Sequence, residues 1–112
     1  MVKQGKSPDR GDYVWLDFGP VRGREQAGRR PAIVLSRRAY NARSGLALVC
    51  PITSQEKHYP FEVATANAKV HGIILTDQLT CIDWITRKPR YITKASDAVV
   101  ANVIEKTKLL IS

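Results

Sequence analysis

Short apolar segments separated by polar loops constrain the fold of this chain most. Each segment is rich in β-branched or aromatic residues, and each is too short for a typical buried helix, so we expect strands. In the first of them, Val14 and Leu16 alternate with Trp15 and Asp17, which is the period of a strand with one apolar face. The expected strands are Gly11–Phe18, Pro31–Ser36, Leu46–Thr53, Pro60–Ala64, Gly72–Thr76, Leu79–Trp84 and Tyr91–Lys94.

The pattern changes to a helical period only near the C-terminus. Ser96 is suited to cap a helix, and Asp97 places a negative charge in its first turn. An apolar stripe then follows at helical spacing, made of Val100, Val103, Ile104 and Ile111. A further turn of helix is expected within 37–44, ending at Gly45, and a basic turn within 87–90. The predicted fold is therefore mainly β with one C-terminal helix, packed on a small, strongly curved antiparallel barrel.

Length and composition are those of one globular domain spanning residues 1–112. The chain has 112 residues, of which 44% are hydrophobic and 25% charged. No apolar run approaches a membrane span, and no hydrophobic stretch follows the charged N-terminus as it would in a secretory signal. We therefore expect a cytoplasmic protein that does not act at a membrane. Cys50 and Cys81 lie in apolar surroundings and are expected to be buried thiols in a reducing compartment.

The charge of the chain indicates an acidic partner. The formal net charge is +8, and ten of the 18 basic residues lie in residues 1–44 with only four of the ten acidic ones. Such an excess informs about partners rather than about fold, and it favours nucleic acid, an acidic protein, or both.

The loop before the second expected strand concentrates this charge. It sets one carboxylate, Glu25, among the arginines at positions 22, 24, 29 and 30, and Pro31 opens the strand. An acid among cations at the rim of a rigid strand suits a site that acts on a phosphodiester. The alternative is a solvated basic loop, since most runs of charge only interact with water.

Cleavage of RNA without a metal needs three kinds of group. One takes the proton of the 2′-hydroxyl, one protonates the leaving 5′-oxygen, and one stabilises charge on the phosphoryl oxygens. Glu25 is the better base, because a guanidinium group is very hard to deprotonate near neutral pH. The planar fork of Arg30 fits phosphate oxygens, and Thr53 offers a hydroxyl donor to them. These roles require the two loops to lie together.

Several motifs occur in order along the chain. They are GDYVWLDF at 11–18, EQAGRRPAIVLS at 25–36, Tyr40-Asn41, PITSQEKHYPFEV at 51–63, Gly72, Asp77-Gln78 and Trp84. With these motifs the chain closely resembles the MazF/PemK family of toxin endoribonucleases over essentially its whole length. The resemblance implies an SH3-like barrel of the PemK/CcdB type with a C-terminal helix, and a homodimer. It also implies cleavage of single-stranded mRNA at short sequences without metal or cofactor, leaving a 2′,3′-cyclic phosphate and a 5′-hydroxyl and so inhibiting growth.

The resemblance carries three catalytic positions onto this chain. The arginine of the family's Arg-Pro step and the threonine of its Pro-x-Thr segment fall on Arg30 and Thr53, and its loop glutamate falls on Glu25. Arg29 stands where relatives often have histidine, so this chain lacks an imidazole there.

Further residues are expected to bind RNA by stacking, by reading base edges or by contacting phosphates. They are Trp15, Asp17, Arg29, Lys57, Tyr59, Asp77, Gln78, Trp84 and Arg87. His58 and His71 are more often bystanders than ligands in such positions.

The resemblance also implies an antitoxin whose acidic, disordered segment folds over the RNA groove. Two alternatives remain open: a non-catalytic growth inhibitor of the gyrase-poison type, which shares the fold, and a barrel that binds RNA without cutting it.

Overall fold

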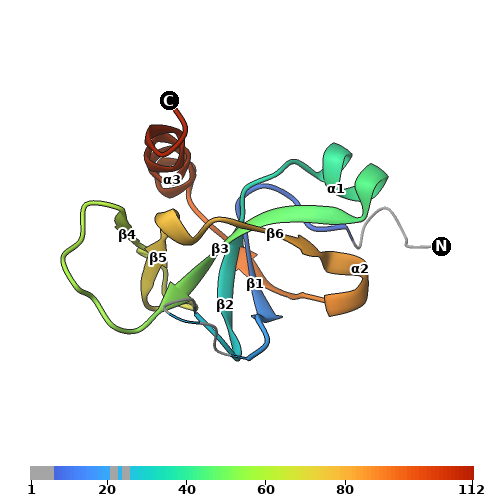
Figure 1. Ribbon diagram of the computed structural model, residues 1–112, viewed down its shortest axis with the longest axis horizontal. Coiled ribbons are helices and arrows are strands. Elements are labelled where there is room, and N and C mark those ends of the chain that lie inside the picture. The colour runs from blue at the N-terminus through green and yellow to red at the C-terminus, as the bar shows by residue number, and fades with distance from the viewer. Residues whose placement is uncertain (1–6, 21–22, 24–25) are drawn as a thin grey trace.

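A computed structural model describes residues 7–20, 23 and 26–112 of the chain (Figure 1). Seven strands form the framework: β1 (Asp12–Asp17), β2 (Arg29–Val34), β3 (Leu46–Thr53), β4 (Glu62–Ala64), β5 (Ile73–Leu75), β6 (Thr80–Asp83) and β7 (Arg90–Lys94). The helices of the described residues are α1 (Arg38–Ser44), α2 (Trp84–Arg87) and α3 (Asp97–Leu109), and the 3₁₀ turn η2 spans Thr76–Gln78. The predicted mainly β fold with a C-terminal helix is confirmed.

All strand pairs are antiparallel, and β3 is shared by two parts of the sheet. The path of neighbouring strands runs β4-β5-β3-β2-β1-β7. The first half of β3 pairs with β6, and its last two residues, Ile52 and Thr53, pair with β5. Because one long strand serves both parts, the sheet bends sharply along β3 (Figure 1). Within the described residues, the path ends at β4 and β7 without pairing them, so the expected barrel is a curved, open sheet.

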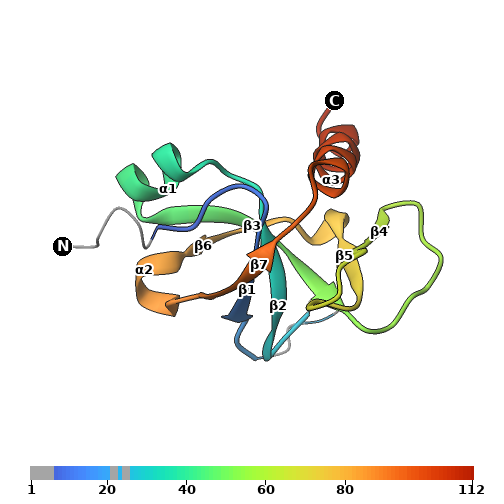
Figure 2. The same ribbon diagram turned by 180° about the vertical axis from the view of Figure 1, so that it is seen from behind.

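Helix α3 covers one face of this sheet. Tyr13, Ile33 and Cys50 are fully buried there and pack with Val99 and Val103 of the helix. The Ser96 side chain accepts a hydrogen bond from the Val99 N–H, which confirms the predicted cap. Figure 2 shows β7 leading directly into α3 on this side of the molecule. Burial raises the pKa of the Cys50 thiol to about 12, which disfavours its thiolate form.

The predicted apolar stripe of α3 is wrong at its end. The buried positions are Val99, Val103 and Thr107, with Val100 and Ile104 packed against the same core. Ile111 lies beyond the helix and is 87% exposed. The predicted stripe runs two residues past the end of the helix, since apolar character alone does not mark where the last turn ends.

The opposite face of the sheet has a second core. Val14, Leu16, Ala32 and Val49 are buried on this face, together with Trp84 at the start of α2. The indole N–H of Trp84 donates to the Asn41 carbonyl oxygen at 2.8 Å. The strands therefore carry apolar groups on both faces.

Helix α1 ends at Gly45, whose φ of 75° is the left-handed conformation that glycine adopts readily. The expectation of a buried Cys81 is wrong: this residue is exposed on β6. Its neighbours in sequence are apolar, but β6 lies beside β3 with only Ile82 facing the core. In the part of the chain described, no helix is long and apolar enough to cross a membrane.

Candidate active site

Strand pairing brings Arg30 and Thr53 to the same face of the sheet. In the ladder between β2 and β3, Ala32 lies opposite Pro51, and the pairing is antiparallel. Two residues back from Ala32 is Arg30, and two residues beyond Pro51 is Thr53. Since side chains alternate between faces, both residues project to the face of Ala32 and Pro51, at neighbouring ends of the two strands. Two segments more than 20 residues apart in sequence thus meet here.

The guanidinium group of Arg30 is held by the loop between β1 and β2. Its Nε and Nη2 donate to the Ala27 carbonyl oxygen at 2.9 and 2.7 Å. The base of the loop is closed by two backbone bonds, from Phe18 N to Gly28 O and from Gly28 N to Gly19 O. An arginine has five donors in a planar fork, so a group held by two of them remains able to bind an anion.

A pocket of about 250 Å³ opens beside Thr53. Six segments of the chain contribute to it: the β1–β2 loop, the end of β3, the β3–β4 loop, the start of β4, the end of β5 and η2. Its lining residues are Gln26, Thr53, Gln55, Lys57, Tyr59, Glu62, Leu75, Asp77 and Gln78. The structure therefore brings five predicted site residues together, namely Thr53, Lys57, Tyr59, Asp77 and Gln78. Hydroxyl, ammonium, amide and aromatic groups converging in one hollow are suited to bind a nucleotide.

The Gln78 side chain fixes the β1–β2 loop against this pocket. Its Oε1 accepts a hydrogen bond from the Gln26 N–H at 3.0 Å. Gln26 and Ala27, which holds Arg30, are consecutive residues, so Gln78 and Arg30 anchor the same stretch of loop from two sides. Gln78 was expected to read bases, and this contact shows that it also positions the loop.

Glu62 organises the β3–β4 loop and was not anticipated from the sequence. Both of its carboxylate oxygens accept from the Lys57 N–H at 3.2 Å, and Oε1 accepts from the Tyr59 N–H at 3.3 Å. His58 between them has a φ of 58°, in the left-handed region, which turns the flanking N–H groups toward one acceptor. On the far side of the loop, Lys106 Nζ of α3 donates to the Pro60 carbonyl oxygen at 2.8 Å.

Other predicted site residues lie elsewhere. Trp84 is only 5% exposed, so its ring is a core element and cannot offer a face to a base. His58 is exposed, with its Nδ1 3.4 Å from the Glu56 carboxylate, and His71 is exposed on another loop. Glu25, the expected base, lies outside the described residues.

Three predicted residues, Trp15, Asp17 and Arg29, project to the other face of the sheet, because they alternate with Leu16 and Arg30. Arg87 lies at the edge of β1, where its Nη1 donates to the Asp17 carbonyl oxygen at 2.8 Å. The single groove expected for RNA is thus divided between two faces.

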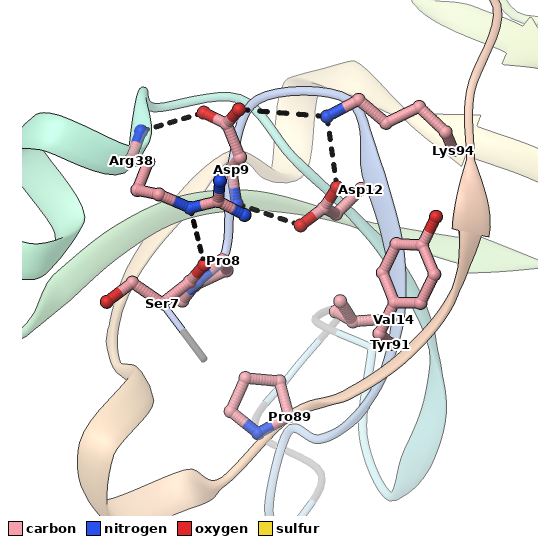
Figure 3. Close-up of a pocket in the computed structure, with 9 residues that line it drawn as sticks. All are labelled: Ser7, Pro8, Asp9, Asp12, Val14, Arg38, Pro89, Tyr91 and Lys94. Atoms are coloured by element: carbon pink, nitrogen blue, oxygen red, sulfur yellow. Dashed lines mark hydrogen bonds and ion pairs between the residues drawn. The ribbon is translucent and has the colours of Figure 1, made fainter. Parts of the chain in front are cut away.

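A second pocket, of about 400 Å³, lies between the N-terminal segment, α1 and β7 (Figure 3). Its charges neutralise one another: Lys94 Nζ is 3.0 Å from Asp12 and 3.8 Å from Asp9. Burial by itself would raise the pKa of the Asp9 carboxyl group. Hydrogen bonds from the backbone N–H groups of Arg38 and Arg10, together with the charge of Lys94, outweigh burial and lower this pKa. This cluster ties the N-terminal segment to the sheet and offers no net charge to a polyanion. Nowhere in the described parts of the chain do three metal-binding side chains gather.

The chain is similar to several known proteins. Residues 9–111 match the family model described as PemK-like, MazF-like toxin of type II toxin-antitoxin system. "Endoribonuclease toxin MazF" of Escherichia coli (strain K12) is 49% identical over 80 residues, covering 71% of this chain and 72% of the relative. "Endoribonuclease toxin ChpB" of the same organism is 33% identical over 99% of both chains.

Solved structures with the same fold include MazF from Deinococcus radiodurans, with a TM-score of 0.88 and 44% identity over 94% of this chain and 96% of that one. A MazE–MazF structure from the same organism has a TM-score of 0.83 and 45% identity with the same coverage.

Proposed function

Because the chain belongs to the PemK-like, MazF-like family of toxins of type II toxin-antitoxin systems, we propose that it is an endoribonuclease that cleaves single-stranded RNA at the pocket beside Thr53, with Arg30 on the same sheet face. The observation that carries this proposal is the shared sheet face of Arg30 and Thr53, beside a pocket lined by polar and aromatic groups. The net charge of +8 favours a polyanionic substrate.

The proposed reaction is an internal transfer at phosphorus. Glu25 takes the proton of the 2′-hydroxyl, whose oxygen bonds to the adjacent phosphorus while the bond to the 5′-oxygen breaks. The 5′-oxygen gains a proton from water or from the Arg30 guanidinium. Arg30 and Thr53 donate hydrogen bonds to the phosphoryl oxygens as their charge increases. The products are a 2′,3′-cyclic phosphate and a 5′-hydroxyl, and no metal is needed.

Around this centre, the pocket residues are proposed to hold the flanking nucleotides. Lys57 contacts a phosphate, Tyr59 stacks on a base, and Asp77 accepts hydrogen bonds from base edges. Tyr59 is 54% exposed, so its ring is accessible for stacking.

One assay separates this function from its alternatives. Purified protein is incubated with single-stranded RNA and a chelator, and the ends of the products are analysed. Cleavage with a cyclic phosphate is the expected result. RNA that is bound but intact would indicate a binding barrel, and intact RNA together with inhibited gyrase would indicate the poison. Strict dependence on added magnesium would contradict the mechanism.

Removing the Glu62 carboxylate tests whether the β3–β4 loop must be held in place. We expect Glu62→Ala to lower kcat/KM roughly tenfold, mainly through KM, because hydrogen bonds to a charged acceptor contribute about 1.5–3 kcal/mol. Glu62→Gln keeps one acceptor oxygen, so its kcat/KM should lie between those of wild type and Glu62→Ala. Glu56→Gln, in the same loop but exposed and paired among the described residues with His58, is the matched control and should behave as wild type. Equal kinetics for Glu62→Ala and wild type would contradict the positioning role.

We also propose that the protein forms a homodimer and binds an acidic antitoxin, in keeping with the MazE–MazF complexes among its structural neighbours. An apolar hollow of about 440 Å³ on the α1, β3 and α3 side, which includes Tyr40, Leu48, Leu79 and Ile111, is the proposed contact between the two copies. These four side chains are between 37% and 87% exposed.

A charge placed in this hollow should disrupt the dimer. We expect Leu48→Lys to sediment as a monomer at concentrations where wild type sediments as a dimer, because an ammonium group would be buried without a partner. Ala101→Lys, which adds the same charge to an exposed position of α3, should leave the dimer intact. A dimeric Leu48→Lys protein would place the interface elsewhere.

A further inference from the structure

A second cationic and aromatic surface lies on the sheet face opposite Arg30. The Arg29 guanidinium carbon lies 5.9 Å from the centroid of the Trp15 ring, which is the geometry of a cation–π pair. Arg90, Tyr91 and Ile92 of β7 complete an open hollow of about 600 Å³ with them. We call these five residues the aromatic platform.

The aromatic platform lies at the same ends of β1 and β2 as the candidate active site. Arg29 and Arg30 are the first two residues of β2, and they pair with Asp17 and Leu16 of β1. Consecutive residues of a strand project to opposite faces, so one guanidinium serves each face. A polyanion that leaves the Arg30 face around the end of β2 therefore meets Arg29 next.

We propose that the aromatic platform is a subsite for single-stranded RNA outside the cleavage pocket, where one base stacks against Trp15 while Arg29 and Arg90 contact its phosphates. The proposal rests on the proposed function, and it adds a second binding region that contributes affinity and not chemistry. Stacking of a base on an aromatic side chain contributes about 1–3 kcal/mol, and it tolerates any base because every base has a π face.

Charge and shape both favour a nucleotide here. None of the five platform residues is acidic, and Arg87 and Lys88 precede β7 in the chain. Trp15 is 41% exposed, so it offers ring surface to a ligand. The hollow is wide and open, whereas the residues that dominate protein–protein binding are usually anchored in deep, fully desolvated pockets. An acidic peptide is therefore the competing occupant that the experiment must distinguish.

The test compares short and long oligonucleotides that cannot be cleaved. Both carry 2′-O-methyl groups and the sequence at which the protein cuts; the short one spans only that sequence, and the long one adds eight nucleotides on each side. Binding is measured by fluorescence anisotropy of an end label. We expect Trp15→Ala and Arg90→Ala each to weaken binding of the long oligonucleotide about tenfold, with a much smaller effect on the short one. Trp15→Phe should bind the long oligonucleotide almost as tightly as wild type, since it keeps an aromatic face.

Arg43→Ala, which removes an exposed arginine on α1, is the control and should change neither affinity. Intrinsic fluorescence gives an independent measurement, because Trp84 is buried and Trp15 is the other tryptophan of the chain. Quenching of the exposed tryptophan by the long but not the short oligonucleotide is expected.

The proposal would be overturned if Trp15→Ala and Arg90→Ala lost equal affinity for the short and the long oligonucleotide, or lost affinity for neither. So would a result in which Trp15→Ala weakens binding only of a synthetic peptide of glutamate and leucine, which would assign the platform to a protein partner. The wild-type cleavage assay with chelator reports the proposed function separately, so the two failures are distinguishable.

Discussion

We expect Arg30→Ala to cleave single-stranded RNA roughly 10²–10³-fold more slowly than wild type in single-turnover experiments, which is the usual effect of removing one preorganised donor to an oxyanion. The loss has two physical sources. The guanidinium no longer stabilises the phosphoryl oxygens, and the Ala27 carbonyl oxygen loses two donors that hold the β1–β2 loop at the pocket.

Further variants separate these two sources. Arg30→Lys keeps the positive charge but cannot reproduce the two-donor contact with Ala27, so we expect an intermediate rate. We expect Glu25→Ala to lose less activity than Arg30→Ala, because water can accept the proton in place of the carboxylate. Arg43→Ala controls for the loss of one positive charge far from the pocket. An Arg30→Ala rate close to that of wild type would remove this residue from the mechanism.

The strand framework was predictable because its signals are local. Alternation in 11–18, the apolar run in 46–53 and the Ser96 cap each depend on residues that are adjacent in sequence. The observed β3 has the predicted bounds, and the other strands differ from prediction only at their ends.

Features that depend on tertiary contacts were not predictable in the same way. Helix α2 is four residues long, too short to show a helical period, and it is stabilised by the Asp83 side chain accepting from the Thr86 N–H. The exposure of Cys81 and the burial of Trp84 depend on how β6 and α2 lie against β3. No pattern in either neighbourhood specifies that arrangement.

The candidate site was predicted in its residue types but not in its geometry. The types follow from the chemistry that a phosphodiester requires, but the register between β2 and β3 is set by a connection of more than ten residues that contains α1. The anchoring of the loops by Gln78 and Glu62 also escaped prediction, since each contact joins a side chain to a backbone N–H. Such contacts leave little sequence signal, although a charged residue at the first position of the short strand β4 is a feature that could have drawn attention to Glu62.

The second large effect is expected on stability, from Gly72→Ala. A Cβ atom at this position would lie 2.7 Å from the Thr53 carbonyl oxygen and 2.8 Å from Ile52 Cγ2, and the φ of 156° is one that other residues rarely adopt. The oxygen belongs to the backbone of β3, which cannot rotate away, so β5 must move. Overpacking of this kind destabilises by about 1–3 kcal/mol, and backbone strain adds a similar amount. We therefore expect the free energy of unfolding to fall by about 3 kcal/mol, measured by urea denaturation.

Gly19→Ala is the matched control for this effect. Gly19 also has a positive φ, of 82°, but a Cβ atom there would meet nothing within 4 Å. The free energy of unfolding of Gly19→Ala should therefore fall only by the cost of holding an alanine at a positive φ, about 1–2 kcal/mol. Because Gly72 lies against Thr53, the movement of β5 should also displace the Thr53 hydroxyl, so the folded Gly72→Ala protein should cleave RNA more slowly at temperatures well below its unfolding transition. Equal losses of stability in the two variants would show that β5 adjusts without strain, and the close approach of Gly72 to β3 would then not be what fixes Thr53 at the pocket.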